Sequence, residues 1–88
     1  MNDVPGLVLD SETRHVELDG TDLSGATITI NDAMQAGHCV RGVKRWFGEK
    51  GFSFSDFLKE GIPAYDFLST EDGHAIGIAR NKIEREHG

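Results

Sequence analysis

The chain has 88 residues, of which 38% are hydrophobic and 27% are charged, and its formal net charge is −6. This is the composition of an ordinary folded domain, and so short a chain can build only one hydrophobic core. No run of about 18 apolar residues, no secretory signal and no second cysteine beside Cys39 is found, so we expect neither a membrane span nor export nor an internal disulfide.

The first third of the chain shows the alternating hydropathy of short β-strands. Leu7 to Leu9 form an apolar run, and Arg14 to Leu18 and Ala26 to Ile30 alternate between apolar and polar residues. The pair Asp19-Gly20 closes the second strand with a turn. The pattern predicts a three-stranded antiparallel meander over residues 1–30, whose apolar face must be covered by the rest of the chain.

A change to helical patterning follows. Asn31 is a suitable N-cap, and Asp32 in the next position favours the positive end of a helix dipole. Gly37 is expected to interrupt this first helix, and a second helix is predicted over His38 to Lys50. The apolar stripe of the second helix comprises Cys39, Val40, Val43, Trp46 and Phe47.

Clear start and stop signals mark the remaining helices. Ser53 as N-cap with Asp56 in the first turn predicts a helix that ends at Gly61. Pro63 opens another short helix, and a last helix begins near Thr70. The expected buried stripe of the last helix comprises Ala75, Ile76, Ala79 and Ile83.

These elements together predict an α+β fold, an N-terminal three-stranded antiparallel meander followed by four to five short helices. Residues 1–30 would be β-rich and residues 31–88 helical. No repeat, linker or low-complexity segment divides the chain, so we expect residues 1–88 to form a single domain.

The charge is unevenly placed along the chain. Residues 1–35 contain seven acids and one base, for a net charge of −6, whereas residues 36–88 contain eight acids and eight bases. An acidic sheet could attract a basic partner. We therefore take Glu17, Asp19 and Asp22 as one candidate partner-binding set.

Arg41, Lys44 and Arg45 form the second candidate set, because they project from the side of the predicted helix opposite its apolar stripe. Such a face could contact a protein or the phosphates of a nucleic acid. Residues 54–60 and 63–68 have the outline of a helix-turn-helix, but the second segment has no arginine or lysine. The pattern favours a protein partner, with nucleic acid as the alternative.

Cys39 beside His38 invites a catalytic interpretation. Adjacent helical residues point about 100° apart, however, and cannot form the hydrogen-bonded pair that activates a thiol. Because Cys39 belongs to the apolar stripe, we expect a small buried thiol that reacts slowly in the folded protein. A reactive thiol and a metal ligand are the alternatives.

Other chemistry-bearing motifs are missing from the sequence. It has no paired Cys and His spacing for zinc, no calcium-binding loop and no phosphate-binding loop. We therefore predict no catalytic residues, no metal and no cofactor.

One stretch of the chain has a family likeness. It is carried by His38-Cys39-Val40-Arg41-Gly42-Val43-Lys44-Arg45-Trp46-Phe47, by Phe57-Leu58-Lys59-Glu60-Gly61-Ile62-Pro63-Ala64, and by Leu68-Ser69-Thr70 leading into a helix. From Ile28 to about Arg80 the chain resembles short, uncharacterised reading frames of tailed bacteriophages and prophages. The resemblance implies a phage setting and carries no activity.

The functional expectation is a non-enzymatic, phage-encoded protein-interaction module, either a virion or assembly component or an inhibitor of a host protein. The expected partner is a phage structural protein or a host enzyme, and self-association is open. A small nucleic-acid-binding regulator is the alternative. The expected location is the host bacterial cytoplasm or the virion.

Overall fold

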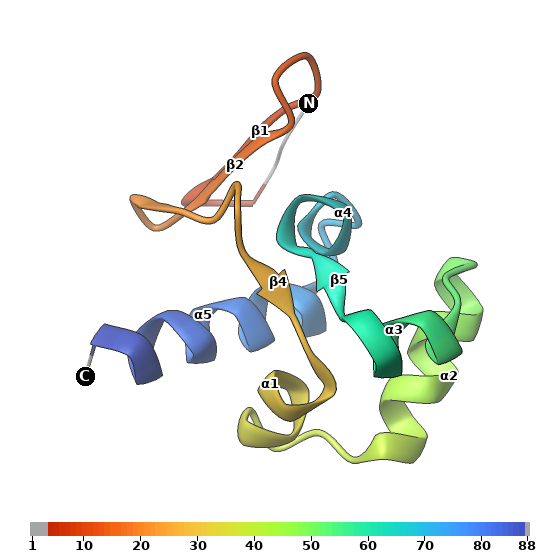
Figure 1. Cartoon of the computed structure of the whole chain (residues 1–88). Helices are drawn as coiled ribbons and strands as arrows, with labels where there is room; N and C mark the ends of the chain where they lie inside the picture. The colour runs from red at the N-terminus through yellow and green to blue at the C-terminus, as the bar shows by residue number, and fades with distance from the viewer. Residues whose placement is uncertain (1–3, 88) are drawn as a thin grey trace.

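The computed structural model describes residues 4–87 and confirms the α+β fold, with an antiparallel sheet followed by helices (Figure 1). Residues 1–3 and 88 of the expected single domain lie outside the described residues. The three-stranded sheet has the order β1 (Leu7–Asp10), β2 (His15–Leu18), β3 (Thr21–Asp22).

Two further short strands and the helices complete the fold. A separate antiparallel pair is formed by β4 (Thr27–Ile28) and β5 (Ile62–Pro63). The helices are α1 (Ile30–Gln35), α2 (Val40–Lys50), α3 (Phe54–Glu60), α4 (Ala64–Leu68) and α5 (Gly73–His87). Figure 1 shows the three-stranded sheet at one end of the molecule and α1, α2 and α3 at the other, with α5 between them. Between residues 4 and 87 no helix is long and apolar enough to span a membrane.

The third strand of the sheet is not the predicted segment Ala26 to Ile30. Asp19 and Gly20 both have positive φ, 52° and 84°, as a two-residue hairpin turn of the type favoured by Asp-Gly requires. This turn sends the chain straight back, so that Leu18 pairs with Thr21. Ile28 instead pairs with Ile62, which lies on the connection between α3 and α4.

The first two helices also begin at other residues than predicted. Thr29, not Asn31, caps α1 in a capping box with Asp32. Gly37 ends the α1 region with φ 92°, and Cys39 then takes an extended conformation with φ −91° and ψ 155°. Because of this extended residue, α2 begins at Val40 and Cys39 lies outside the helix.

The start and stop signals of α3 are confirmed, whereas Pro63, expected to open the next helix, is the residue before α4. Ser53 Oγ accepts a hydrogen bond from the backbone N–H of Asp56 at 3.2 Å, and α3 ends immediately before Gly61, whose φ is 78°. Gly61 also lies so close to β4 that a Cβ atom there would approach the carbonyl oxygen of Ile28 to 2.8 Å. Only glycine therefore satisfies both the backbone angle and the packing.

The last helix starts at Gly73, three residues later than predicted, and the carboxylate of Asp72 accepts a hydrogen bond from the backbone N–H of His74 at 2.8 Å. Its predicted stripe is nevertheless correct. Ala75, Ile76 and Ala79 are buried, and Ile83 packs at the edge of the core. The periodicity therefore identified the buried face of α5 correctly but not the residue at which the helix starts.

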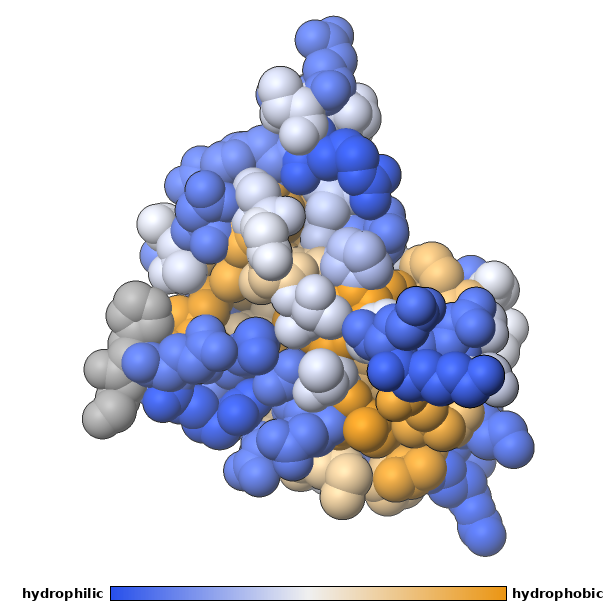
Figure 2. Space-filling view, viewed as in Figure 1, coloured by the Kyte–Doolittle hydropathy of each residue, from blue (hydrophilic) through white to orange (hydrophobic). Residues whose placement is uncertain are grey.

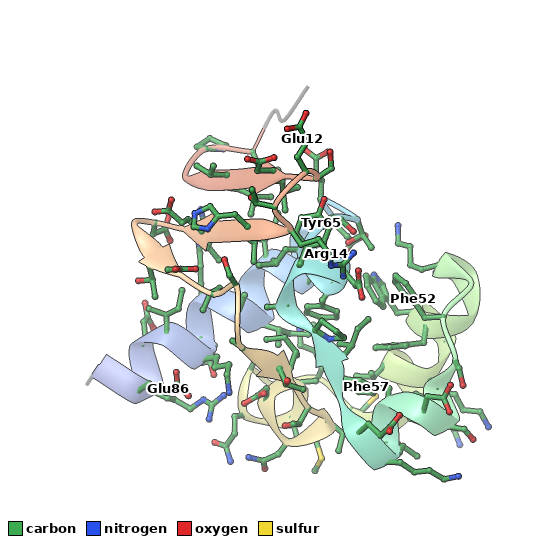
Figure 3. The ribbon with its side chains drawn as sticks, turned by 45° about the horizontal axis from the view of Figure 1, so that its top comes forward. Glu12, Arg14, Phe52, Phe57, Tyr65 and Glu86 are labelled. Carbon is green, nitrogen blue, oxygen red and sulfur yellow. The ribbon has the colours of Figure 1, made fainter. Side chains whose placement is uncertain are left out.

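The centre of the helical part is the ring of Phe47, which is 1% exposed. Its centroid lies 4.3 Å from that of Phe57 and 5.3 Å from that of Trp46. Phe52, Phe54 and Phe67 complete the shell at 5.9 to 6.3 Å. Figure 3 shows Phe52 and Phe57 on the side of the molecule that α2 and α3 form. These rings join α2, α3 and α4 in one cluster.

Two arginines attach the sheet to the helices. Arg80 of α5 donates to the carboxylate of Asp19 at 2.8 Å and to the carbonyl oxygen of Pro5 at 3.0 Å. Arg14 pairs with Asp66 of α4 at 2.7 Å, and its guanidinium lies 4.7 Å from the ring centroid of Tyr65 (Figure 3). The apolar face of the sheet meanwhile buries Leu7, Val16 and Leu18.

A buried carboxylate joins α1 to α5. The side chain of Asp32 is 5% exposed and meets Arg85 at 2.8 Å and Lys82 at 3.2 Å. Burial by itself would raise the pKa of Asp32, but Arg85, the backbone N–H of Thr29 and Lys82 together hold this pKa below its ordinary value of 3.8. The ionised carboxylate is therefore the form that the fold stabilises.

We expect Phe57→Ala to lower the free energy of unfolding by about 3 to 5 kcal/mol, because it opens a cavity in the aromatic cluster. The matched control is Leu58→Ala in the next position of α3, where the side chain is 50% exposed. This control should change stability by less than about 0.5 kcal/mol. Urea unfolding followed by circular dichroism measures both, and equal effects would contradict the described register of α3.

We expect Asp32→Asn to cost about 3 kcal/mol at neutral pH, the lower end of the range for a broken buried pair, since Lys82 and Arg85 keep some solvent contact. The lowered pKa means that this stabilisation is present above the ordinary carboxyl value and is lost as pH falls through the folded-state value. Urea unfolding from about pH 7 down to about pH 2.5 should show a smaller acid-dependent loss in Asp32→Asn than in the wild type. Asp56→Asn, at an exposed carboxylate, should retain the wild-type slope.

Candidate functional site

The three basic residues predicted on α2 are exposed on one side of the helix. The side chains of Arg41, Lys44 and Arg45 form no hydrogen bond or ion pair with the described residues. Most other cations of the chain are paired with carboxylates: Arg14, Lys50, Arg80, Lys82 and Arg85. We call Arg41, Lys44 and Arg45 the α2 basic face; its charges are free to meet an external anion.

Next to this face lies an apolar hollow of about 230 Å³, which we call the α2–α5 pocket. Its wall is built by aromatic and aliphatic side chains that approach from α1 through α5. The lining residues are Ala33, His38, Gly42, Val43, Arg45, Trp46, Glu49, Phe57, Phe67, His74, Ala75 and Ile78. Arg45 belongs both to the pocket and to the α2 basic face, so the two features are continuous.

Polar side chains surround the pocket. The imidazole rings of His38 and His74 meet edge to face with centroids 5.6 Å apart. Both histidines also line a second, more open hollow beside α5. Glu49 is the one carboxylate among the residues of the α2–α5 pocket. The surroundings are thus of mixed charge.

Asp72 stands at the start of α5 near Trp46. Burial opposes its ionised form, but the backbone N–H of His74, the indole N–H of Trp46 and the ammonium of Lys50 together lower the pKa of Asp72. Lys50 Nζ lies 3.4 Å from the carboxylate of Asp72. The Trp46 Nε1 atom is buried and makes no hydrogen bond of good geometry with the described residues.

The acidic candidates have internal partners. Asp19 holds Arg80, and Glu17 contacts the imidazole of His15 at 2.7 Å. Asp22 accepts a hydrogen bond from the backbone N–H of Ser24 at 2.9 Å and lies 3.8 Å from His15. The hydrogen bond to Glu17, aided by the charge of Asp22, raises the pKa of His15. These carboxylates are therefore less available to a partner than the α2 basic face.

The prediction of a buried Cys39 is wrong. The thiol is exposed, and its Sγ accepts a hydrogen bond from the backbone N–H of Gly42 at 3.3 Å. Cys39 acts as the N-cap of α2, because the preceding turn at Gly37 keeps it extended and outside the helical stripe. Val40, also expected in the stripe, belongs to α2 as its first residue but is 44% exposed.

Apolar surface is concentrated at the helical end of the molecule. Figure 2 shows hydrophobic atoms gathered towards the lower right, on the side of α1, α2 and α3, while the sheet end is mostly hydrophilic. The large exposed apolar side chains between residues 4 and 87 are Val8, Met34, Val40 and Leu58. Three of these four belong to α1, α2 and α3.

No group of three His, Cys, Asp or Glu side chains in the described part of the chain could hold a metal ion. The fold and the site together define a small α+β domain with an exposed basic helix beside an apolar pocket. Comparison of this chain with protein-family models, with curated proteins and with solved structures finds no match.

Sequence patterning found the α2 basic face and missed the α2–α5 pocket. Trp46, Phe57 and Phe67 were recognisable as apolar residues on separate helices, but a space between those helices leaves no mark in the sequence. His38 and His74 approach each other across 36 positions for the same reason. Both features, the pocket and the contact between His38 and His74, arise from packing between distant segments and have no local sequence signal.

We expect Cys39 in the native protein to react with a thiol reagent nearly as fast as in the unfolded protein, because the sulfur is exposed. Protection by a factor of about ten or more would contradict this exposure. We also expect Cys39→Ala to be about 1 kcal/mol less stable than Cys39→Ser, since serine can cap α2 and alanine cannot. Thermal and urea unfolding measure the difference.

Proposed function

We propose that this chain is a non-enzymatic protein-interaction module that binds an acidic segment of a partner protein through the α2 basic face. The unpaired state of Arg41, Lys44 and Arg45 supports this proposal most directly. In a folded protein, cations that no internal carboxylate neutralises remain available for complementary charge on a partner. Lys59 is unpaired too, but it stands apart on α3.

The apolar pocket beside the basic face supports a protein partner. Protein interfaces commonly combine a desolvated apolar centre with a polar rim, and Arg45 joins these two parts here. The phage setting remains part of the proposal, because it rests on the resemblance of residues 28 to 80. In that setting the partner would be a phage structural protein or a host enzyme, met in the virion or in the host cytoplasm.

Nucleic acid is the second candidate, and the same unpaired cations favour it. Affinity for a duplex depends largely on how many phosphates the cations of a protein neutralise. The α2 basic face offers three cations on a chain whose net charge is −6. We therefore rank a nucleic-acid regulator below a protein-binding module.

The test compares two substitutions that change the net charge equally. We expect Arg45→Glu to reduce capture of a partner from phage-infected host extract at least about fivefold, because it opposes acidic residues with like charge. Lys59→Glu, on α3, should capture as the wild type does. Quantitative mass spectrometry of the captured proteins gives the readout, and equal capture by both variants would reject the proposed surface.

A second arm addresses the alternative with random-sequence DNA and RNA in gel-shift titrations. We expect no binding tighter than the non-specific level of about 1 μM at physiological salt. Tighter binding that falls steeply with salt and is lost when Arg41, Lys44 and Arg45 become alanine would place the nucleic-acid function first.

A further inference from the structure

We infer that the α2–α5 pocket holds a single aromatic side chain of the acidic segment that the α2 basic face binds. The inference rests on the proposed function and adds to it what the partner must present: one ring, next to carboxylates. The size, the wall chemistry and the charge of the pocket each support this assignment.

The volume of the pocket sets the size of its occupant. An engineered apolar cavity of about 150 Å³ holds one benzene molecule, while pockets for small-molecule ligands usually measure about 300 to 1,000 Å³. At about 230 Å³ the α2–α5 pocket lies between these values. It can accept one side-chain ring and is smaller than the usual site for a nucleotide-sized cofactor.

The residues around the pocket suit a ring in particular. Trp46 is half-buried, and the core residues Phe57, Phe67, Ala75 and Ile78 line the pocket behind it, so the lining is largely aromatic and aliphatic. Aromatic pairs gain energy beyond area burial when they meet edge to face or offset. The interface residues that dominate binding energy are enriched in aromatic side chains seated in such desolvated pockets.

The charges around the pocket determine where the acidic residues of the partner should lie relative to the ring. Arg45 lines the pocket, and Arg41 lies one helical turn earlier on the same side of α2. Glu49 lines the pocket one helical turn after Arg45 and makes the C-terminal half of α2 more negative. The acidic residues of the partner should therefore lie over the N-terminal half of α2, away from Glu49.

Gly42 offers a direct way to block the pocket without damaging the fold. It lines the pocket from within α2, where a Cβ atom would meet only Cys39 Sγ, at an ordinary contact distance of 3.4 Å. Gly48, on the same helix, is exposed and does not line the pocket, and a Cβ atom at this position would have no neighbour within 4 Å. Leucine favours a helix more than glycine does, so both variants should fold.

The experiment titrates the full chain, labelled with ¹⁵N, with two synthetic peptides at about 50 mM salt, where screening is weak. One peptide is Glu-Asp-Glu-Phe-Glu-Asp-Glu, and the other has alanine in place of phenylalanine. We expect the phenylalanine peptide to bind at least about tenfold more tightly, since burial of a phenyl ring commonly contributes that factor. We expect the largest shifts at pocket residues, including the indole N–H of Trp46.

We expect Gly42→Leu to abolish the preference for phenylalanine and Gly48→Leu to keep it. Glu49→Gln should strengthen binding of both peptides, because it removes like charge. If the wild type binds both peptides equally and Arg45→Glu still loses binding, the inference of an aromatic side chain in the pocket is wrong. The α2 basic face would then remain the binding surface. If neither peptide binds and Arg45→Glu captures its partner normally, both the inference and the proposed function fail.

Discussion

The packing around Phe47 is the interaction on which the rest of this structure depends. An 88-residue chain with one cysteine has no disulfide to hold it, so its stability must come from burial of apolar surface. Phe47 is nearly inaccessible, and its ring touches aromatic neighbours from α2, α3 and α4. Trp46, Phe57 and Phe67 belong to this cluster and also line the α2–α5 pocket, so the core and the pocket proposed to bind a partner share these residues.

Electrostatics then decides which charges are available to a partner. Carboxylates of the acidic N-terminal third meet cations of the C-terminal helix: Asp19 pairs with Arg80, and the buried Asp32 pairs with Lys82 and Arg85. These ion pairs join the sheet and α1 to α5, and each uses charges that would otherwise face solvent. The α2 basic face has no such counterpart within the described residues, so it remains the positive surface of a negatively charged protein.

Some sequence-based expectations were correct because their signals are local. The Ser53 cap involves atoms three residues apart, and the end of α3 depends on the φ angle of Gly61 itself. The expectations for Cys39 and for the third strand failed at single backbone positions. One extended residue after Gly37 moved Cys39 out of α2, and the tight Asp19-Gly20 turn made Thr21–Asp22 the third strand. Hydropathy periodicity does not register either change.

The sequence by itself determined the α+β class, the Ser53 cap of α3, the buried stripe of α5 and the presence of three cations on α2. Each follows from neighbouring residues, since helix caps, turn geometry and side-chain periodicity act over a few positions. Only the tertiary structure decided that Ile28 pairs with Ile62, that Asp32 meets α5, and that helices α1 to α5 leave a pocket beside Arg45. Those outcomes depend on contacts between segments far apart in the chain, where many alternative pairings satisfy the same local pattern and packing selects among them.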